Sequence, residues 1–223
     1  MDYRRLSEQG GRSSVLSTIM AHFWFKCFGT MGFTLTFFSA YLYLLKNPAV
    51  QVAVMPVTML DRFVVFEPLA LPIYLSLWIY VSLPPMLMRT RREIIEYGGW
   101  IGGLCLVALG IFYFWPSAVP PANIDWAMYP GVAFLKGVDA AGNACPSLHV
   151  ATAVFSGIWL HWRLPAAGLG RGARLLNACW CVAIAYSTMA TKQHVAVDVV
   201  AGVALGVVGA WCSRTKGLLR VRA

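Results

Sequence analysis

Charged side chains are scarce in this sequence. Asp, Glu, Lys and Arg together make up 12% of the 223 residues, whereas a soluble domain ordinarily contains about 25%. This scarcity excludes an ordinary soluble globular domain. Long uncharged runs recur along the chain and leave no length for a separate soluble domain, so we expect a single membrane domain.

Two further absences narrow the possible functions. The net charge is +9, but no basic face or basic and aromatic patch occurs outside the apolar runs, so nucleic acid is not an expected partner. Five of the six cysteines lie in or at the ends of apolar runs, so the sequence implies no disulfide framework. The sixth, Cys145, lies in a long loop, and we expect an aqueous thiol reagent to reach it.

Six apolar segments are candidates for membrane-spanning helices, which need about 20 mostly apolar residues. The shorter run 49–60 contains Pro56, and we interpret it as an interfacial segment. The sequence therefore predicts an all-α fold, a polytopic six-helix transmembrane bundle over 22–212, between an N-terminal segment (1–21) and a basic tail (213–223). The predicted spans are 22–45, 69–88, 97–115, 148–163, 174–190 and 194–212.

The distribution of basic residues predicts the orientation of this bundle. If the N-terminus is cytoplasmic, thirteen Lys and Arg residues lie on the cytoplasmic side, and only Lys46, Arg62, Lys136 and Lys192 lie on the other. Membrane proteins show this excess of positive charge in their cytoplasmic parts. We therefore expect both termini to be cytoplasmic, in the cytoplasmic (inner) membrane. Lys26, near the cytoplasmic end of the first span, is expected to snorkel towards water.

Glycines four residues apart occur in two of the predicted spans. They belong to "GGWIGG" (98–103) and "GVALG" (202–206). Small residues at this spacing let helices approach closely, so both segments are predicted helix contacts.

Two similar polar clusters lie at the predicted outer ends of helices, in "NACPSLHVATAV" (143–154) and "TKQHVAVDVVAG" (191–202). Ser147 and Thr191 are suitable N-cap residues, which places His149 and His194 in the first turns of their helices. Asp198 follows His194 by four residues and is the only acid within the six spans. An acid inside the membrane ordinarily faces the protein interior or a cavity and is functional by default. Two helix N-termini beside these side chains predict an anion site, with phosphate as the usual guest.

These residues resemble the motifs of the type 2 phosphatidic acid phosphatase superfamily. "CPSLHV" resembles its second motif, and "STMATKQHVAVD" (187–198) resembles its third, with the spacing of Ser187, His194 and Asp198 kept. "PSLH", "TKQH" and "LDRFVVFEP" (60–68) are similar to the branch that contains inositol phosphorylceramide synthases.

The resemblance implies a membrane-embedded lipid phosphatase (a phosphoric monoester hydrolase) or a lipid head-group phosphotransferase. It implies that His194 is the nucleophile and forms a phosphohistidine, that Asp198 orients it, and that His149 is the general acid and base. Ser147 and Ser187 are the implied phosphate-binding residues, and no metal or other cofactor is implied. The implied partners are a lipid phosphate substrate, the bilayer and, for transfer, a lipid alcohol acceptor, with the active site facing the periplasm or the outside.

The sequence departs from the family pattern in its basic residues. Thr188 stands where the third motif has arginine, and the first motif is absent, since the chain has no Arg-Pro pair. A phosphate in a desolvated site still needs positive charge. We expect Lys192, which is two residues before His194, to supply it, with Arg62 as the next candidate.

Three alternatives remain open from the sequence. Hydrolysis and transfer to a lipid hydroxyl share one covalent intermediate, and the short loops favour hydrolysis slightly. His149, His194 and Asp198 also suit a metal-dependent hydrolase, because imidazole and carboxylate ligate metals. A transporter or non-catalytic lipid-phosphate-binding protein is disfavoured, because its site would ordinarily lie at mid-membrane.

Overall fold

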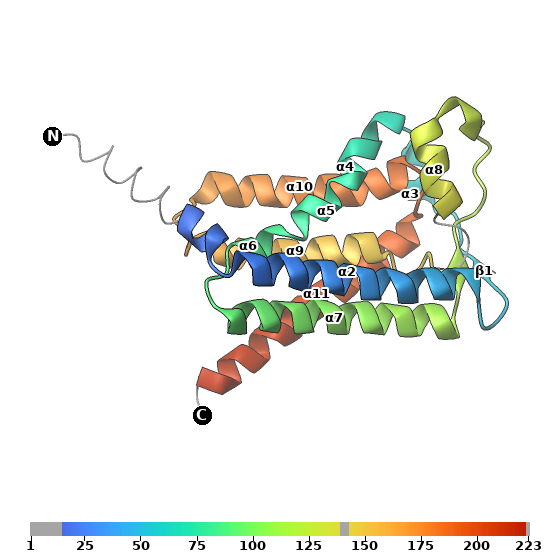
Figure 1. The fold of residues 1–223 in the computed structure, drawn as a ribbon. Coiled ribbons are helices and arrows are strands. Elements are labelled where there is room, and N and C mark those ends of the chain that lie inside the picture. Colours follow the sequence, from blue (N-terminus) through green and yellow to red (C-terminus); the bar gives the residue numbers. More distant parts are fainter. Residues whose placement is uncertain (1–14, 139–142, 222–223) are drawn as a thin grey trace.

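The protein is a bundle of long helices with a short two-stranded sheet at one end. The structure, a computed structural model, describes residues 15–138 and 143–221; parts of the predicted terminal segments, 1–14 and 222–223, lie outside the described residues. Figure 1 shows the long helices side by side, with the start of α2 and the end of α11 at the same end of the bundle. The long helices are α2 (Phe23–Lys46), α7 (Arg91–Phe114), α9 (Leu148–Arg163), α10 (Arg171–Ala190) and α11 (Ala196–Val221).

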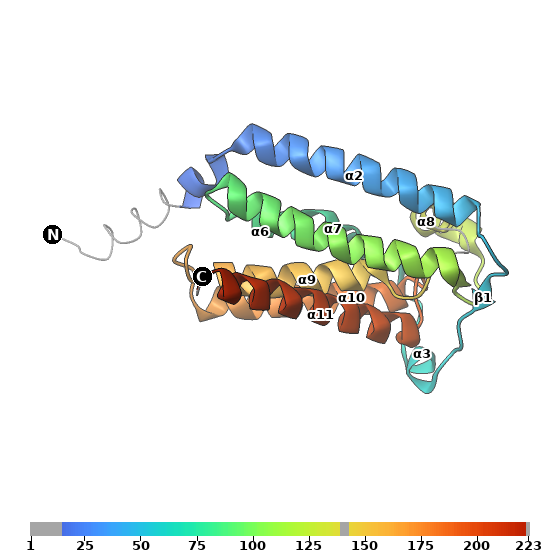
Figure 2. The ribbon, with the colours of Figure 1, turned by 90° about the horizontal axis from the view of Figure 1, so that it is seen from below.

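The long helices form two groups. In Figure 2, α2 and α7 lie together on one side of the molecule, and α9, α10 and α11 lie together on the other. Helix α11 continues without a break through residue 212 to Val221, so the predicted tail is an extension of this helix over its described part.

Between α2 and α7 the chain returns along the bundle in short helical pieces. Sequence analysis predicted one continuous helix over 69–88, and this expectation was wrong in detail. Proline lacks a backbone N–H and its ring crowds the preceding turn, and three prolines, Pro72, Pro84 and Pro85, lie in this stretch. The pieces are α3 (Met59–Phe63), η1 (Pro68–Ala70), α4 (Leu71–Leu75), α5 (Leu77–Tyr80) and α6 (Leu83–Met86).

The segment 49–60 lies at the end of the bundle and does not cross it. Its strand β1 (Ala53–Val54) pairs in parallel with β2 (Ser117–Ala118) of the long connection before α9. The connection also contains η2 (Trp126–Met128) and α8 (Pro130–Val138). These elements gather around the ends of α9 and α11, where the candidate site lies.

Four segments of the described chain are long and apolar enough to cross a membrane, and they identify the protein as membrane-embedded. Large apolar side chains such as Trp24, Leu106 and Trp211 are exposed on their surfaces, as lipid-facing residues are. The predicted spans 148–163 and 174–190 correspond to α9 and α10, which do not meet the same criterion. The four segments are Phe23–Lys46, Pro68–Met86, Arg91–Phe114 and Ala196–Arg214.

Glycines bring α11 into close contact with α9. A methyl group on Gly202 would lie 2.5 Å from the carbonyl oxygen of Ser147, and one on Gly206 would lie 2.6 Å from that of Ala151. Both contacts are to backbone, which has little freedom to move away. The predicted helix contact at 202–206 is therefore confirmed.

The glycines of 98–103 play a different role. A methyl group on Gly98, Gly99 or Gly103 would have no neighbour within 4 Å, and only one on Gly102 would touch another helix, at Phe33 of α2. The prediction of a close helix contact holds in this segment only at Gly102, because no backbone of a neighbouring helix lies against the other three glycines.

This difference predicts opposite effects of alanine on the two helices. Gly206→Ala is expected to lower the free energy of unfolding by about 1–3 kcal/mol, because the methyl group overlaps the α9 backbone. Gly103→Ala is expected to raise it by about 0.5–1 kcal/mol, because alanine favours a helix and nothing obstructs it. Denaturant titration of both purified variants in detergent measures the two changes. A Gly206→Ala protein as stable as Gly103→Ala would contradict the close contact.

Candidate active site

The first turn of α9 is fixed by Ser147, as predicted. The Ser147 hydroxyl accepts a hydrogen bond from the N–H of Val150 at 3.3 Å, so it is the N-cap. The N–H of Ser147 donates to the carbonyl oxygen of Asp198 at 2.9 Å. The cap therefore places His149 in the first turn of α9 and ties this turn to α11.

The second histidine is held in a different way from the one predicted. Thr191 does not cap α11, because α10 ends at Ala190 and the Thr191 hydroxyl donates back to Ser187 at 2.8 Å. The chain reverses at Lys192, which has a left-handed φ of 57°. The N–H groups of Gln193 and His194 then both donate to the carbonyl oxygen of Thr188. His194 consequently lies in a tight turn just before α11.

His194 and Asp198 form a buried pair, as their spacing predicted. His194 Nδ1 lies 3.5 Å from Asp198 Oδ2, and the two side chains are 6% and 0% exposed. Asp198 Oδ2 also accepts a hydrogen bond from the N–H of Val195 at 3.0 Å. The carboxylate therefore lies on the Nδ1 side of the imidazole, which leaves Nε2 on the opposite edge of the ring.

Two aromatic residues that sequence analysis missed hold the other histidine. The ring of Tyr74 stacks on His149 with centroids 3.9 Å apart, and Trp78 meets it edge-on at 6.5 Å. The His149 imidazole is hydrogen-bonded to the backbone of Tyr74, and its Nε2 is buried without a partner in the described structure. Apolar spans commonly contain aromatic residues, so nothing in the sequence singled out these two.

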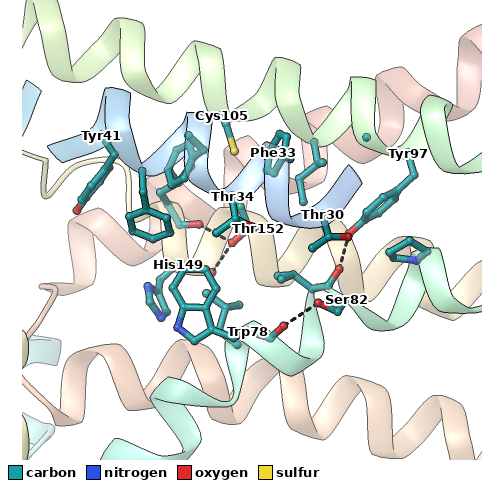
Figure 3. A pocket seen from close by; sticks show the side chains of 18 of the residues that line it. Thr30, Phe33, Thr34, Tyr41, Trp78, Ser82, Tyr97, Cys105, His149 and Thr152 are labelled. Atoms are coloured by element: carbon teal, nitrogen blue, oxygen red, sulfur yellow. Dashed lines mark hydrogen bonds between the residues drawn. The ribbon is translucent and has the colours of Figure 1, made fainter. Parts of the chain in front are cut away.

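Both histidines line one cavity of about 680 Å³. Figure 3 shows His149 beside Trp78 at one end of it. Two further buried amides lie close to the site and were also missed, Asn143 in the cavity wall and Gln193 next to His194. Asn143 Oδ1 and Gln193 Nε2 have no partner within the described residues, so both remain available to a bound polar group.

The predicted phosphate ligands lie around the site, but none of the four, Ser147, Ser187, Lys192 and Arg62, is part of the described cavity wall. The Ser187 hydroxyl donates to the carbonyl oxygen of Ile184 at 2.7 Å. Lys192 Nζ donates to the carbonyl oxygen of Val64, and Arg62 is exposed on α3. A phosphate at the histidines would therefore be reached by Lys192 only after its side chain turns.

Asp61 ties the segment before η1 to the first turn of α11. Its Oδ2 accepts hydrogen bonds from the N–H and hydroxyl of Thr58 at 2.7 and 2.8 Å, and its Oδ1 accepts one from the N–H of Ala196 at 2.7 Å. Partial burial opposes the charge, but these hydrogen bonds and the nearby Lys192 hold the pKa of Asp61 below its ordinary value. The charged Asp61 side chain thus holds Thr58 to Ala196, which is two residues along the chain from His194.

Cys145 is not the accessible thiol that its loop position suggested. It is 5% exposed, and its N–H donates to the hydroxyl of Ser117 at 2.8 Å. Burial, together with the neighbouring Asp198, raises the pKa of the Cys145 thiol to about 11. Since the thiolate is the reactive form, the expectation of ready labelling was wrong.

The metal alternative gains no support from the geometry. Within residues 15–138 and 143–221, no group of three or more His, Cys, Asp or Glu side chains is arranged to hold a metal ion. Asp198 Oδ2 accepts the N–H of Val195 at 3.0 Å and lies 3.5 Å from His194 Nδ1, so this oxygen lies beside a backbone amide and one imidazole.

A helical membrane protein with a buried His–Asp pair and a second histidine at one cavity has the equipment of a phosphoryl-transfer enzyme. Residues 113–218 match the family model of the PAP2 superfamily. The matched region contains both histidine motifs. The match supports the resemblance to the type 2 phosphatidic acid phosphatase superfamily, whose members are phosphatases and phosphotransferases. No curated protein and no solved structure matches the chain.

The charge on Asp61 predicts a pH-dependent stability. Because the pKa of Asp61 is depressed on folding, its contribution is fully present above the ordinary value of 3.8 and is lost as the pH falls through the lower folded pKa. Thermal unfolding in detergent should therefore show Asp61→Asn less stable than wild type at pH 7, with the two curves converging below about pH 4. A difference that persists unchanged well below this pH would mean that Asp61 does not act through its charge.

Proposed function

We propose that this protein is a membrane-embedded phosphoryl-transfer enzyme that acts on lipid phosphates through a phosphohistidine at His194. The observation that supports this most directly is the placement of the His194–Asp198 pair and His149 at one apolar cavity. A transporter needs no such acid–base pair, and a lipid tail needs an apolar space beside it.

The first half of the reaction uses the free nitrogens of both histidines. His194 Nε2 attacks phosphorus while Asp198 holds the proton on Nδ1, which is the tautomer that a nucleophile needs. The bond from phosphorus to the lipid oxygen breaks, and His149 Nε2 donates a proton to the departing oxygen. The products are a phosphohistidine and a lipid alcohol.

The second half reverses these roles. His149, now neutral, takes a proton from water or from a lipid hydroxyl, whose oxygen attacks the phosphohistidine. The bond from phosphorus to His194 Nε2 breaks, and the histidine is restored. Water gives phosphate, and a lipid alcohol gives a new phosphate ester. The short loops favour hydrolysis, and the resemblance of "TKQH" to the inositol phosphorylceramide synthase branch keeps transfer open.

The negative charge of the phosphate is matched from several directions. The N-terminus of α9, capped by Ser147, carries the positive end of the helix dipole. Ser187 belongs to the third motif, and Lys192 and Arg62 supply positive charge at this end of the bundle. These four residues are our proposed phosphate-binding set.

The proposed site faces the outside of the cytoplasmic membrane. The starts of α7 and α10 and the end of α9, which carry Arg91, Arg92, Arg163, Arg171 and Arg174, lie at the opposite end of the bundle from the histidines (Figure 1), and positive charge marks the cytoplasmic side. The six-span topology, with α9 and α10 as the additional spans and both termini cytoplasmic, follows from the same asymmetry.

Phosphate release from phosphatidic acid by the purified protein tests this function, with and without diacylglycerol or ceramide as acceptor. His194→Ala and His149→Ala are each expected to abolish turnover, and Asp198→Asn to lower it by about 10²-fold or more. Acid-labile ³²P on the wild-type protein should be absent from His194→Ala. His161→Ala, in the last turn of α9, is the matched control and should retain activity. Turnover by His194→Ala would end the covalent mechanism.

The role of Lys192 is tested separately, because a substitution there changes two things at once. It removes the positive charge, and it alters a residue whose backbone is left-handed. If the ammonium group binds phosphate, Lys192→Ala should lower the rate by about 10²–10³-fold, and Lys192→Arg should retain part of it. Lys192→Gly suits the left-handed backbone but lacks the charge, so it should be as inactive as Lys192→Ala. Parallel assays of Lys136→Ala and Arg62→Ala complete the set. Full activity in Lys192→Ala with collapse in Arg62→Ala would assign the charge to α3.

A further inference from the structure

The cavity at the histidines extends far beyond the reacting groups. Its walls come from α2 and α7 on one side and from α4, α5, α6 and the start of α9 on the other. His149 and Asn143 line one end, and Lys26, Pro85 and Ile94 line the other. In Figure 3, Tyr97 and Ser82 lie at the end away from His149. The cavity is therefore a passage that runs along the bundle and is partly open along its side, where wall residues such as Leu75 and Trp78 are exposed.

Lys26 closes the end opposite the histidines. Its side chain is 6% exposed, so it does not snorkel to water as its position in the sequence suggested. Nζ donates to the carbonyl oxygens of Thr18 at 2.8 Å, Met86 at 3.1 Å and Ile19 at 3.4 Å. This lysine joins α2, the segment before it and the end of α6 into a floor.

The wall between these ends offers little to a polar ligand. The hydroxyl of Ser82 donates to the carbonyl oxygen of Trp78, and that of Thr152 donates to that of Leu148 (Figure 3). The Tyr97 hydroxyl is shared between the Val81 carbonyl and Ser156. Since these polar groups are already paired within the protein, the matching occupant is a hydrocarbon.

Helix geometry gives the depth of the passage below the catalytic histidine. Phe38 contacts Trp78, and Trp78 contacts His149, so Phe38 lies close to the level of His149. Lys26 is twelve residues earlier on α2, which corresponds to about 18 Å of helix. An extended chain of single bonds advances roughly 3.5 Å for every three bonds, so roughly 15 bonds reach the floor.

We propose that this passage holds the hydrocarbon tail of the lipid phosphate, with the phosphate at the histidines, and that the Lys26 floor limits the tail to about 16 carbons. The inference rests on the proposed function and extends it to a specificity for chain length. The phosphate head group binds at the histidine end, and contact with the Lys26 floor limits the length of the tail.

Two neighbouring glycines on α7 provide a matched test. A methyl group on Gly98 or on Gly99 would meet nothing within 4 Å, but Gly98 lines the passage and Gly99 is exposed on the outside. Gly102 lies level with Phe33, so Gly98, one turn earlier, lies near the level of Gly29. This is nine residues, or about 14 Å, from Phe38. Gly98→Leu therefore blocks the last part of the passage, and Gly99→Leu leaves it open.

The experiment measures kcat/KM for phosphate release from single-chain alkyl phosphates of about 8 to 20 carbons. Wild type and Gly99→Leu should favour chains near 16 carbons and discriminate against longer ones. Gly98→Leu should retain the activity on the shortest chain and lose about tenfold or more on 16 carbons, because the longer tail overfills the shortened space. Both substitutions replace glycine by leucine in one helix, so the change in helix propensity is shared.

A readout without turnover separates this inference from the proposed function. An alkyl phosphate of about 16 carbons with a photoreactive group at its tail end should label the protein near Lys26, Pro85 and Ile94. Labelling of the lipid-facing Trp24 and Phe28 instead, or equal chain-length profiles for Gly98→Leu and Gly99→Leu, would overturn the tail passage. Absence of phosphate release from every chain length, with labelling still at the floor, would overturn the proposed reaction and leave the passage in place.

Discussion

The close contact of α9 with α11 is the constraint on which the candidate site depends. Gly202 and Gly206 allow the helix backbones to meet, and the hydrogen bond from Ser147 N–H to the Asp198 carbonyl fixes their relative register. His149 and His194 are 45 residues apart in the sequence, yet His149 lies two residues after Ser147 and His194 lies four residues before Asp198, the two partners of this hydrogen bond. A bulkier residue at 202 would separate the two halves of the site before it altered any reacting group.

Sequence patterns predicted the parts of the site that depend on local spacing. The Ser147 cap and the His194–Asp198 pair are short-range features, and both are found. The turn that holds His194 was not predictable in the same way. It requires a left-handed backbone at Lys192, a conformation that lysine rarely adopts, and a carbonyl of Thr188 that accepts two N–H groups. A threonine before an apolar run therefore looked like an N-cap although it ends the preceding helix.

The remaining differences arise from contacts between segments far apart in the sequence. Tyr74 and Trp78 contact His149 because the proline-rich segment 68–86, between α2 and α7, packs against α9. Glycines at the same spacing produced a close contact in α11 and open space in α7, because only the glycines of α11 lie against the backbone of a neighbouring helix. Spacing identifies small side chains on one face, and the neighbouring helix decides whether they become a contact or part of a wall.

The two halves of the chain contribute differently to the cavity. The region that matches the PAP2 superfamily, 113–218, carries His149, His194 and Asp198, the groups that would act on a phosphate. The greater part of the apolar wall comes from before this region, from α2, the 68–86 return and α7. A phosphate presents the same chemistry on any lipid, whereas hydrocarbon tails differ in length and shape. Changes in the wall can therefore alter which lipid fits while the reacting groups stay in place, provided that they leave Tyr74 and Trp78, whose rings contact His149, unchanged.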